Sequence, residues 1–191
     1  MEKNLETESK VLLNSEDYNI IYDYFNLEKA KPIKQVNYYF DTIKFSLKDN
    51  GYNMRVRHVL NDDSYTLTVK IPYKESHIEI NQEITYDEFV DFVEKCKIPE
   101  GYIKEKVDEF NKEPVILLTK LITTRYEFEY EQGLIALDYN EYNNLFDYEL
   151  EYEGKSMDYC KSVISRLLNR LNIEFEFSKE SKRKRAIQSI L

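Results

Sequence analysis

Residues 4–13, NLETESKVLL, carry charged side chains at every second position: Glu6, Glu8 and Lys10. The residues between these three are uncharged. Because side chains alternate between the two faces of an extended strand, all three charges lie on one face, within about 14 Å of one another. We therefore start from the hypothesis that this strand presents a face that binds a charged ligand.

The same two-residue alternation recurs along most of the chain and predicts roughly eight strands. One face of each strand is apolar, and the other carries charges of both signs. Arg55 and Arg57 share the polar face of one such strand, and Glu149 and Glu151 share that of another. Beyond the opening segment, the expected strands cover residues 35–42, 52–60, 64–71, 77–84, 115–131, 134–142 and 147–153.

Helical patterns lie between and after these strands. Ser15 is expected to cap a helix over residues 15–25, and Thr85 with Glu88 forms a capping box for a helix over 86–96. Further helices are expected over residues 102–111 and 157–171, and in the basic tail SKESKRKRAIQSIL at 178–191.

Two arrangements could bury such strands. In one, helices cover the apolar face and the charged face meets water through cross-strand ion pairs. In the other, an antiparallel sheet closes so that the charged faces line a hydrated lumen, and the helices cover part of the outside. Exposed ion pairs contribute only about 0–1 kcal/mol each to stability. The large number of regularly spaced charges therefore favours a role in binding over a role in stability. The alternation alone leaves open which face is concave.

The composition limits the classes of partner. The chain has 191 residues and a formal net charge of −9, which argues against general binding to nucleic acid polymers or anionic membranes. An anionic ligand needs a local basic patch or a bridging metal. Neither a signal peptide nor a run of 18 apolar residues is recognisable, so we expect a soluble, cytoplasmic protein.

The order of the charged positions resembles the CYTH superfamily, the triphosphate tunnel metalloenzymes. Glu6-x-Glu8-x-Lys10 resembles the ExExK signature of that family. The other elements follow in the family's order: Arg55-x-Arg57, Lys70, Arg125, Asp138, Glu149-x-Glu151 and a closing Ser181-Lys182-x-x-Arg185. The segments VNYYFDT (36–42) and FDYELEYE (146–153) are similar to the Gram-positive bacterial branch.

This resemblance implies a mainly β, α+β fold: an eight-stranded antiparallel β-barrel that forms a tunnel, with helices packed outside. Residues 1–191 would form one domain, with 157–191 as a C-terminal helical segment. Family members hydrolyse or cyclise triphosphate compounds with Mg²⁺ or Mn²⁺. The aromatic outer faces of the strands are expected to pack under helices, with a homodimer contact as the alternative.

The resemblance also implies roles for individual residues. The basic residues that would surround phosphate oxygens are Lys10, Arg55, Arg57, Lys70, Arg125, Lys182 and Arg185. The carboxylates that would hold the divalent cation are Glu6, Glu8, Asp138, Glu149 and Glu151. Lys10, Glu83 and Glu127 are the catalytic candidates, the two acids as groups that orient a water. Ion pairing with neighbouring basic side chains is the alternative role of both Glu83 and Glu127, and the number of metal ions stays open.

The resemblance to this family leaves three functions open. The first is hydrolysis of inorganic tripolyphosphate or of a small organic triphosphate such as thiamine triphosphate. The second is cyclisation of ATP to cyclic AMP, for which no stretch resembling a purine pocket is recognisable. The third is a non-catalytic module that binds polyphosphate or nucleotides, which the complete set of acids and bases disfavours.

Overall fold

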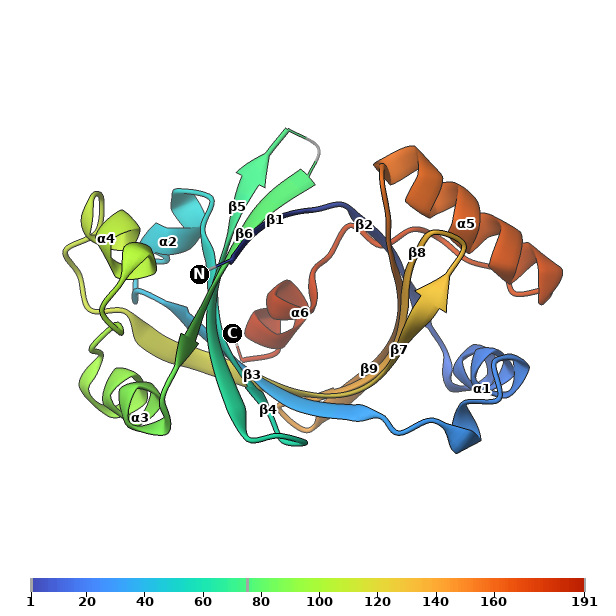
Figure 1. Ribbon diagram of the computed structural model, residues 1–191, viewed down its shortest axis with the longest axis horizontal. Coiled ribbons are helices and arrows are strands. Elements are labelled where there is room, and N and C mark those ends of the chain that lie inside the picture. The colour runs from blue at the N-terminus through green and yellow to red at the C-terminus, as the bar shows by residue number, and fades with distance from the viewer. Residues whose placement is uncertain (1, 75, 191) are drawn as a thin grey trace. The chain divides into compact units, whose positions relative to one another are not determined.

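The computed structural model describes the backbone of residues 2–74 and 76–190, and the side chains of residues 7–74 and 78–190. The chain forms two compact units. The first contains Val36–Lys120 with the N-terminal segment up to Leu5, and the second contains Glu6–Gln35 with the chain from Leu121 onward. Figure 1 labels the elements of both.

An antiparallel sheet forms the frame of the first unit. Its strands, in the order in which they neighbour one another, are β1 (Glu2–Glu6), β6 (Ser76–Ile84), β5 (Ser64–Tyr73), β4 (Asn53–Val59) and β3 (Ile33–Asp41). Antiparallel ladders join β4 to β5 and β5 to β6. The helices of this unit are α2 (Ser46–Asp49), α3 (Tyr86–Lys95) and α4 (Tyr102–Asp108).

Antiparallel strands also form the frame of the second unit. Its neighbouring strands are β7 (Ile116–Tyr130), β8 (Gly133–Tyr142), β9 (Leu145–Glu153) and β2 (Glu8–Leu13). The helices are α1 (Ser15–Tyr24), the 3₁₀ turn η1 (Leu27–Lys29), α5 (Met157–Arg170) and α6 (Lys182–Gln188). Among the described residues, no helix is long and apolar enough to cross a membrane.

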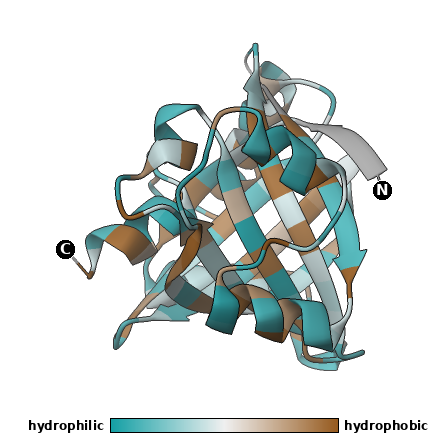
Figure 2. Ribbon diagram, turned by 90° about the vertical axis from the view of Figure 1, so that its left-hand side faces the viewer, coloured by the Kyte–Doolittle hydropathy of each residue, from teal (hydrophilic) through white to brown (hydrophobic). Residues whose placement is uncertain are grey.

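The predicted alternation places the apolar residues of the first unit on one sheet face. Met54, Val56 and Leu67 of β4 and β5 are fully buried there. Phe40 of β3 stacks on Phe92 of α3, with ring centroids 4.0 Å apart. Figure 2 shows hydrophilic and hydrophobic residues alternating along the strands. Each buried aliphatic or aromatic side chain contributes about 1.5–3 kcal/mol, so this face drives helix packing.

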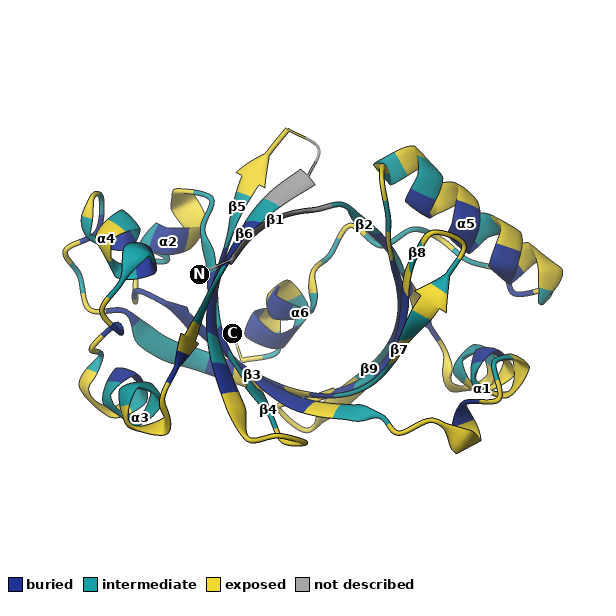
Figure 3. Ribbon diagram, in the orientation of Figure 1, coloured by how far each residue is buried: buried dark blue, intermediate teal, exposed yellow. Residues whose placement is uncertain are grey.

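In the second unit, too, the residues that alternate with the charged ones along each strand are buried. Val11, Leu150 and Tyr152 pack with Leu168 of α5 in one apolar core. Buried residues of α5 follow one side of that helix (Figure 3), and α1 and α5 lie on one face of the sheet while α6 lies on the other (Figure 1). The charged residues of these strands therefore lie on the face that α6 contacts, where a ligand could also bind.

The ends of the helices correct one prediction and agree with another. Asn14, and not Ser15, is the N-cap of α1: its side chain accepts a hydrogen bond from the Asp17 amide at 2.8 Å. The expected choice was wrong because either residue can cap, and the entry of the chain from β2 places Asn14 in the extended conformation. Thr85 and Glu88 form the predicted capping box of α3.

Gly133, where β8 begins, is predicted to be intolerant of a side chain. A Cβ at this position would lie 2.3 Å from the carbonyl oxygen of Glu153 and 2.5 Å from the Tyr152 hydroxyl. We expect Gly133→Ala to lower the free energy of unfolding by about 2 kcal/mol in urea titrations, because the backbone carbonyl cannot move aside. Gln132→Gly at the adjacent left-handed position (φ 65°) serves as the control and should change stability by less than about 1 kcal/mol. Equal stability of Gly133→Ala and the wild type would contradict this packing.

Candidate active site

Strand register assembles the charged face of the second unit. The β7–β8 ladder sets Arg125 opposite Asp138, and the β8–β9 ladder sets Asp138 opposite Glu149. The β2–β9 ladder sets Lys10 opposite Glu151. Residues directly opposite one another in a sheet have Cβ atoms about 4.5–5.5 Å apart, so opposite charges at these positions pair. We call Asp138, Glu149 and Glu151 the carboxylate cluster.

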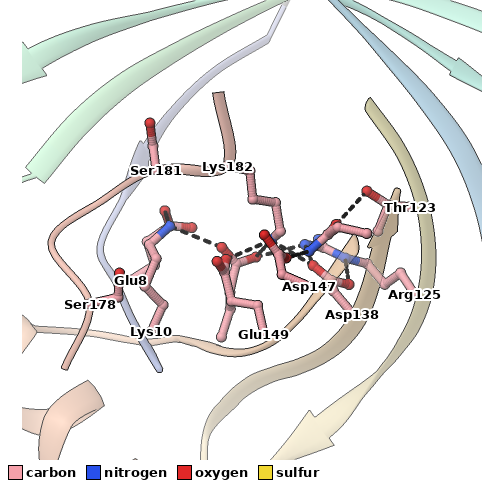
Figure 4. Close-up of polar contacts among 12 residues, drawn as sticks. Glu8, Lys10, Thr123, Arg125, Asp138, Asp147, Glu149, Ser178, Ser181 and Lys182 are labelled. Atoms are coloured by element: carbon pink, nitrogen blue, oxygen red, sulfur yellow. Dashed lines mark hydrogen bonds and ion pairs between the residues drawn. The ribbon is translucent and has the colours of Figure 1, made fainter. Parts of the chain in front are cut away.

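Lys182 lies where the carboxylate cluster converges (Figure 4). Its Nζ is 2.6 Å from Asp138 Oδ2, 2.8 Å from Glu149 Oε1 and 2.9 Å from Glu151 Oε2. Lys182 is the first residue of α6, and the remote C-terminal segment therefore supplies the positive charge at the centre of the cluster.

Lys10 binds the outer side of the same cluster. Its Nζ donates to Glu151 Oε1 at 2.9 Å and to Glu8 Oε1 at 2.8 Å. Of the N-terminal ExExK pattern, Lys10 thus contacts the cluster directly, and Glu8 is joined to it through Lys10. The side chain of the third, Glu6, lies outside the described residues.

Arg125 ties the cluster together with its planar guanidinium. Its Nε and Nη2 each donate to one oxygen of Asp138 at 2.8 Å, and Nη2 also donates to Glu151 Oε2 at 2.7 Å. Nη1 donates to Glu127 Oε2 at 3.3 Å. This two-pronged geometry is specific to arginine and holds Asp138, which is fully buried, in one orientation.

The buried charges shift one another's pKa values in opposite directions. Burial alone would raise the pKa of Asp138 and of Glu151, but nearby cations lower both pKa values below the ordinary range: Arg125 and Lys182 act on Asp138, and Lys10, Lys182 and Arg125 on Glu151. Burial raises the pKa of Glu149 to about 7, against the lowering effect of Lys182. Burial would lower the pKa of Lys182, yet the three carboxylates raise it.

The first unit has a charged face of its own. Arg55 and Lys70 both approach Glu79 Oε2, at 3.5 and 3.3 Å, and Arg57 Nε donates to the Asn37 side chain at 3.4 Å. The Nε–H of Arg55 is buried and has no hydrogen-bond acceptor among the described residues. A buried donor without an acceptor costs about 1–3 kcal/mol, so this group is suited to receive an anionic oxygen.

The two acids expected to orient water occupy exposed positions. Glu127 on β7 is exposed and contacts Arg125, which agrees with the alternative role in ion pairing. Glu83 on β6 is exposed and stands opposite Thr66 in the first unit.

Several polar residues of these faces were not among the predicted site residues. Asp147 of β9, Asn140 of β8 and Glu79 of β6 lie at the alternate positions that form the polar face of their strands. Asp147 binds both Arg185 and the buried Asn140. The alternation that singled out Glu149 and Glu151 extends to Asp147, and this signal could have identified it.

The carboxylate cluster has the chemistry of a site for a hard divalent cation. Oxygens of three carboxylates already converge on one positive charge, and Glu149 Oε1 is buried and accepts no hydrogen bond among the described residues, although Lys182 Nζ is near. Mg²⁺ prefers such oxygens at about 2.0–2.1 Å. In the described part of the chain no group of three or more acidic, histidine or cysteine side chains is arranged to hold a metal ion, and Lys182 occupies the position between the three carboxylates.

Comparison with known proteins places this site in a family. The sequence matches the CYTH domain family over residues 4–187. Because the match covers nearly the whole chain and both units, the protein belongs to the CYTH domain family. The resemblance inferred from the ExExK pattern and the charged positions that follow it is thereby confirmed.

Individual relatives agree with this assignment. The chain is 29% identical over 175 residues to "Putative triphosphatase YjbK" of Bacillus subtilis (strain 168), which covers 91% of this chain and 90% of that protein. A crystal structure of "a putative adenylate cyclase" from Bacillus halodurans superposes with a TM-score of 0.88 at 27% identity, covering 97% and 98% of the two chains. HpAC1 from Hippeastrum shares the fold at 22% identity, with a TM-score of 0.78 over 96% and 95%. The predicted fold class is therefore confirmed.

Proposed function

We propose that this protein is a metal-dependent triphosphatase that hydrolyses the terminal phosphoanhydride of inorganic tripolyphosphate or of a small organic triphosphate such as thiamine triphosphate. The observation that carries the proposal is the alternation of cations and carboxylates on one polar face, with Lys182 at its centre. The name of the Bacillus subtilis relative, a triphosphatase, supports the same reaction.

The basic side chains of the site bind and orient the phosphate oxygens. In the second unit these are Lys10, Arg125, Lys182 and Arg185. Each of them is held by carboxylates in the absence of substrate, so an incoming polyanion exchanges one set of oxygens for another without new charges having to be brought in. The family resemblance assigns the same role to Arg55, Arg57 and Lys70 of the first unit.

The carboxylates keep this basic site selective for a substrate that arrives with a cation. Glu6, Glu8, Asp138, Glu149 and Glu151 are the residues that would hold Mg²⁺ or Mn²⁺. When bound, such an ion neutralises the charge on the phosphate oxygens and on the leaving group. Glu127 or Glu83 is proposed to orient the attacking water and to accept its proton, and Lys10 to stabilise the transferring phosphoryl group.

ATP cyclisation is the second candidate, because the Bacillus halodurans relative is named as an adenylate cyclase. That reaction joins the ribose 3′-oxygen to the α-phosphorus and releases pyrophosphate, whereas hydrolysis at the terminal phosphorus releases orthophosphate. The two functions therefore differ in their products, although both use cations around a triphosphate.

A product assay separates these functions. Purified protein is incubated with Mg²⁺ or Mn²⁺ and with tripolyphosphate, thiamine triphosphate or ATP, and orthophosphate and cyclic AMP are measured. We expect orthophosphate from tripolyphosphate or thiamine triphosphate, and its loss when EDTA removes the metal. Cyclic AMP as the main product would establish the cyclase, and binding of triphosphate without any product would refute both catalytic functions.

A further inference from the structure

The geometry points to Asp147 as a positioning residue of this site: it holds Arg185, and thereby docks helix α6 with Lys182 onto the carboxylate cluster. Arg185 donates to Asp147 through Nε at 2.8 Å and through Nη2 at 3.2 Å. Both side chains are largely buried, with exposed fractions of 9% for Arg185 and 17% for Asp147. The pair is therefore shielded from water and ionic screening.

The hydrogen bonds to Asp147 use the full capacity of its carboxylate. Oδ1 accepts from Arg185 Nη2 and from Asn140 Nδ2, and Oδ2 accepts from Arg185 Nε and from the Tyr142 hydroxyl at 2.7 Å. An ionised carboxylate offers about four acceptor positions, and all four are used here. Asp147 is thus already engaged on every side, which suits a supporting role better than direct contact with a ligand.

A buried row of polar residues fixes the orientation of Asp147. The strand registers place Thr123, Asn140 and Asp147 side by side across β7, β8 and β9. The Thr123 hydroxyl lies 2.8 Å from Asn140 Oδ1, and Asn140 Nδ2 donates to Asp147 Oδ1 at 2.9 Å. Thr123 and Asn140 are almost completely buried, so the row is rigid. On each strand this row is two residues away from the parallel row of Arg125, Asp138 and Glu149, on the same face.

Arg185 transmits this position to the site. Its Nη2 also donates to Glu149 Oε2 at 2.5 Å, so one guanidinium connects Asp147 to the carboxylate cluster. The helix that carries it, α6, has only 7 residues. A helix this short has little stability of its own in water and depends on its tertiary contacts. Asn143, in the turn between β8 and β9, contacts the other end of the helix: its Nδ2 donates to the Ala186 carbonyl at 3.0 Å and to Ser189 Oγ at 2.7 Å.

Hydrogen exchange tests the docking role without reference to activity. We expect Asp147→Asn to speed backbone amide exchange in residues 182–188 by about tenfold or more, measured by mass spectrometry on the full chain, because Arg185 keeps Glu149 but loses the carboxylate that binds it through two nitrogens. Asp23→Asn, which alters an exposed acid on α1 in the same unit, is the matched control and should leave that exchange unchanged. Unchanged exchange in Asp147→Asn, with the protein folded by circular dichroism, would overturn the proposal.

The catalytic consequence rests on the proposed triphosphatase function. We expect Asp147→Asn to lower kcat/KM for tripolyphosphate by about 10- to 100-fold, as for other groups that orient a ligand-holding side chain. If Asp147 acts through Arg185, the double variant Asp147→Asn, Arg185→Gln should be no worse than Arg185→Gln alone in both kcat/KM and exchange. Fully additive losses would contradict a role through Arg185. A protein without triphosphatase activity that still shows the exchange effect would refute the function and leave the docking role standing.

Discussion

Glu151→Gln is expected to lower kcat/KM for tripolyphosphate by on the order of 10²- to 10³-fold, while the protein stays folded. Glu151 is the carboxylate that the largest number of site cations share: Lys10 binds Oε1 at 2.9 Å, and Arg125 and Lys182 bind Oε2 at 2.7 and 2.9 Å. A glutamine keeps the size of the side chain but removes the charge, and its NH2 group replaces one of the two oxygens, so that it faces either Lys10 or the pair Arg125 and Lys182. It also removes one of the proposed metal ligands.

Steady-state phosphate release and calorimetric titration with Mn²⁺ measure this effect. The control is Glu141→Gln, which changes an exposed glutamate of β8 in the same sheet and should leave both measurements within about twofold of the wild type. Glu8→Gln should resemble Glu151→Gln, since Glu8 also binds Lys10. A wild-type rate in Glu151→Gln would show that the metal and charge assignments of the cluster are wrong.

Arg125→Ala is expected to produce the largest loss of stability, about 3–5 kcal/mol in the free energy of unfolding. Arg125 holds both oxygens of the fully buried Asp138 and one oxygen of Glu151. Without the guanidinium, the buried carboxylate of Asp138 keeps Lys182 but loses the other of its two counter-charges, together with two hydrogen bonds. Urea unfolding monitored by tyrosine fluorescence measures the loss, because the chain has 17 Tyr and no Trp.

The double variant Arg125→Ala, Asp138→Asn tests whether the excess of buried negative charge causes the loss of stability in Arg125→Ala. It should recover part of the stability lost in Arg125→Ala, because the buried group that needs the cation is then neutral. Arg125→Lys keeps a charge but loses the two-pronged geometry, and should fall between the wild type and Arg125→Ala. A double variant less stable than Arg125→Ala would show that excess negative charge on Asp138 is not the cause of the loss.

The pH dependence of the Arg125→Ala deficit follows from the lowered pKa of Asp138. Pairing holds the folded-state pKa of Asp138 below its ordinary 3.8, so this pair stabilises the folded protein fully above that value and less as pH falls through the folded-state pKa. The difference in unfolding free energy between wild type and Arg125→Ala should thus be largest near neutral pH and narrow below about pH 4.

The elements of the fold were predictable because they depend on local patterns. The two-residue alternation located the strands, except that the opening segment, expected as one strand, is divided at Thr7 into β1 and β2. The capping box of Thr85 and Glu88 located the start of α3. Short elements were missed: α2 and η1 have 4 and 3 residues, too few to show a helical period. The N-cap of α1 was misplaced by one residue, because Asn14 and Ser15 are both good capping residues.

The site was predictable only in part. The alternation of residues shows which strand face a side chain lies on, but it does not show which side chains of other elements contact it. Alternation placed Glu149 and Glu151 on the polar face of β9, and register then joined Glu151 to Lys10 and Glu149 to Asp138. The same parity includes Asp147, Asn140 and Glu79, which the family pattern does not single out. Their roles depend on contacts with Arg185, Thr123 and Arg55, which lie far away in sequence.

The amino-acid sequence by itself determined which side chains share a strand face, and therefore which apolar residues pack against the helices. It also contains the order of charged positions that marks the CYTH family. These are local properties, set by the period of the extended chain. Only the tertiary structure decided that Lys182 sits among three carboxylates and that Asp147 holds Arg185. Those contacts require the seven-residue helix α6 to pack on β8 and β9, which are distant from it in sequence. No local pattern encodes the position of a helix that is too short to be stable alone.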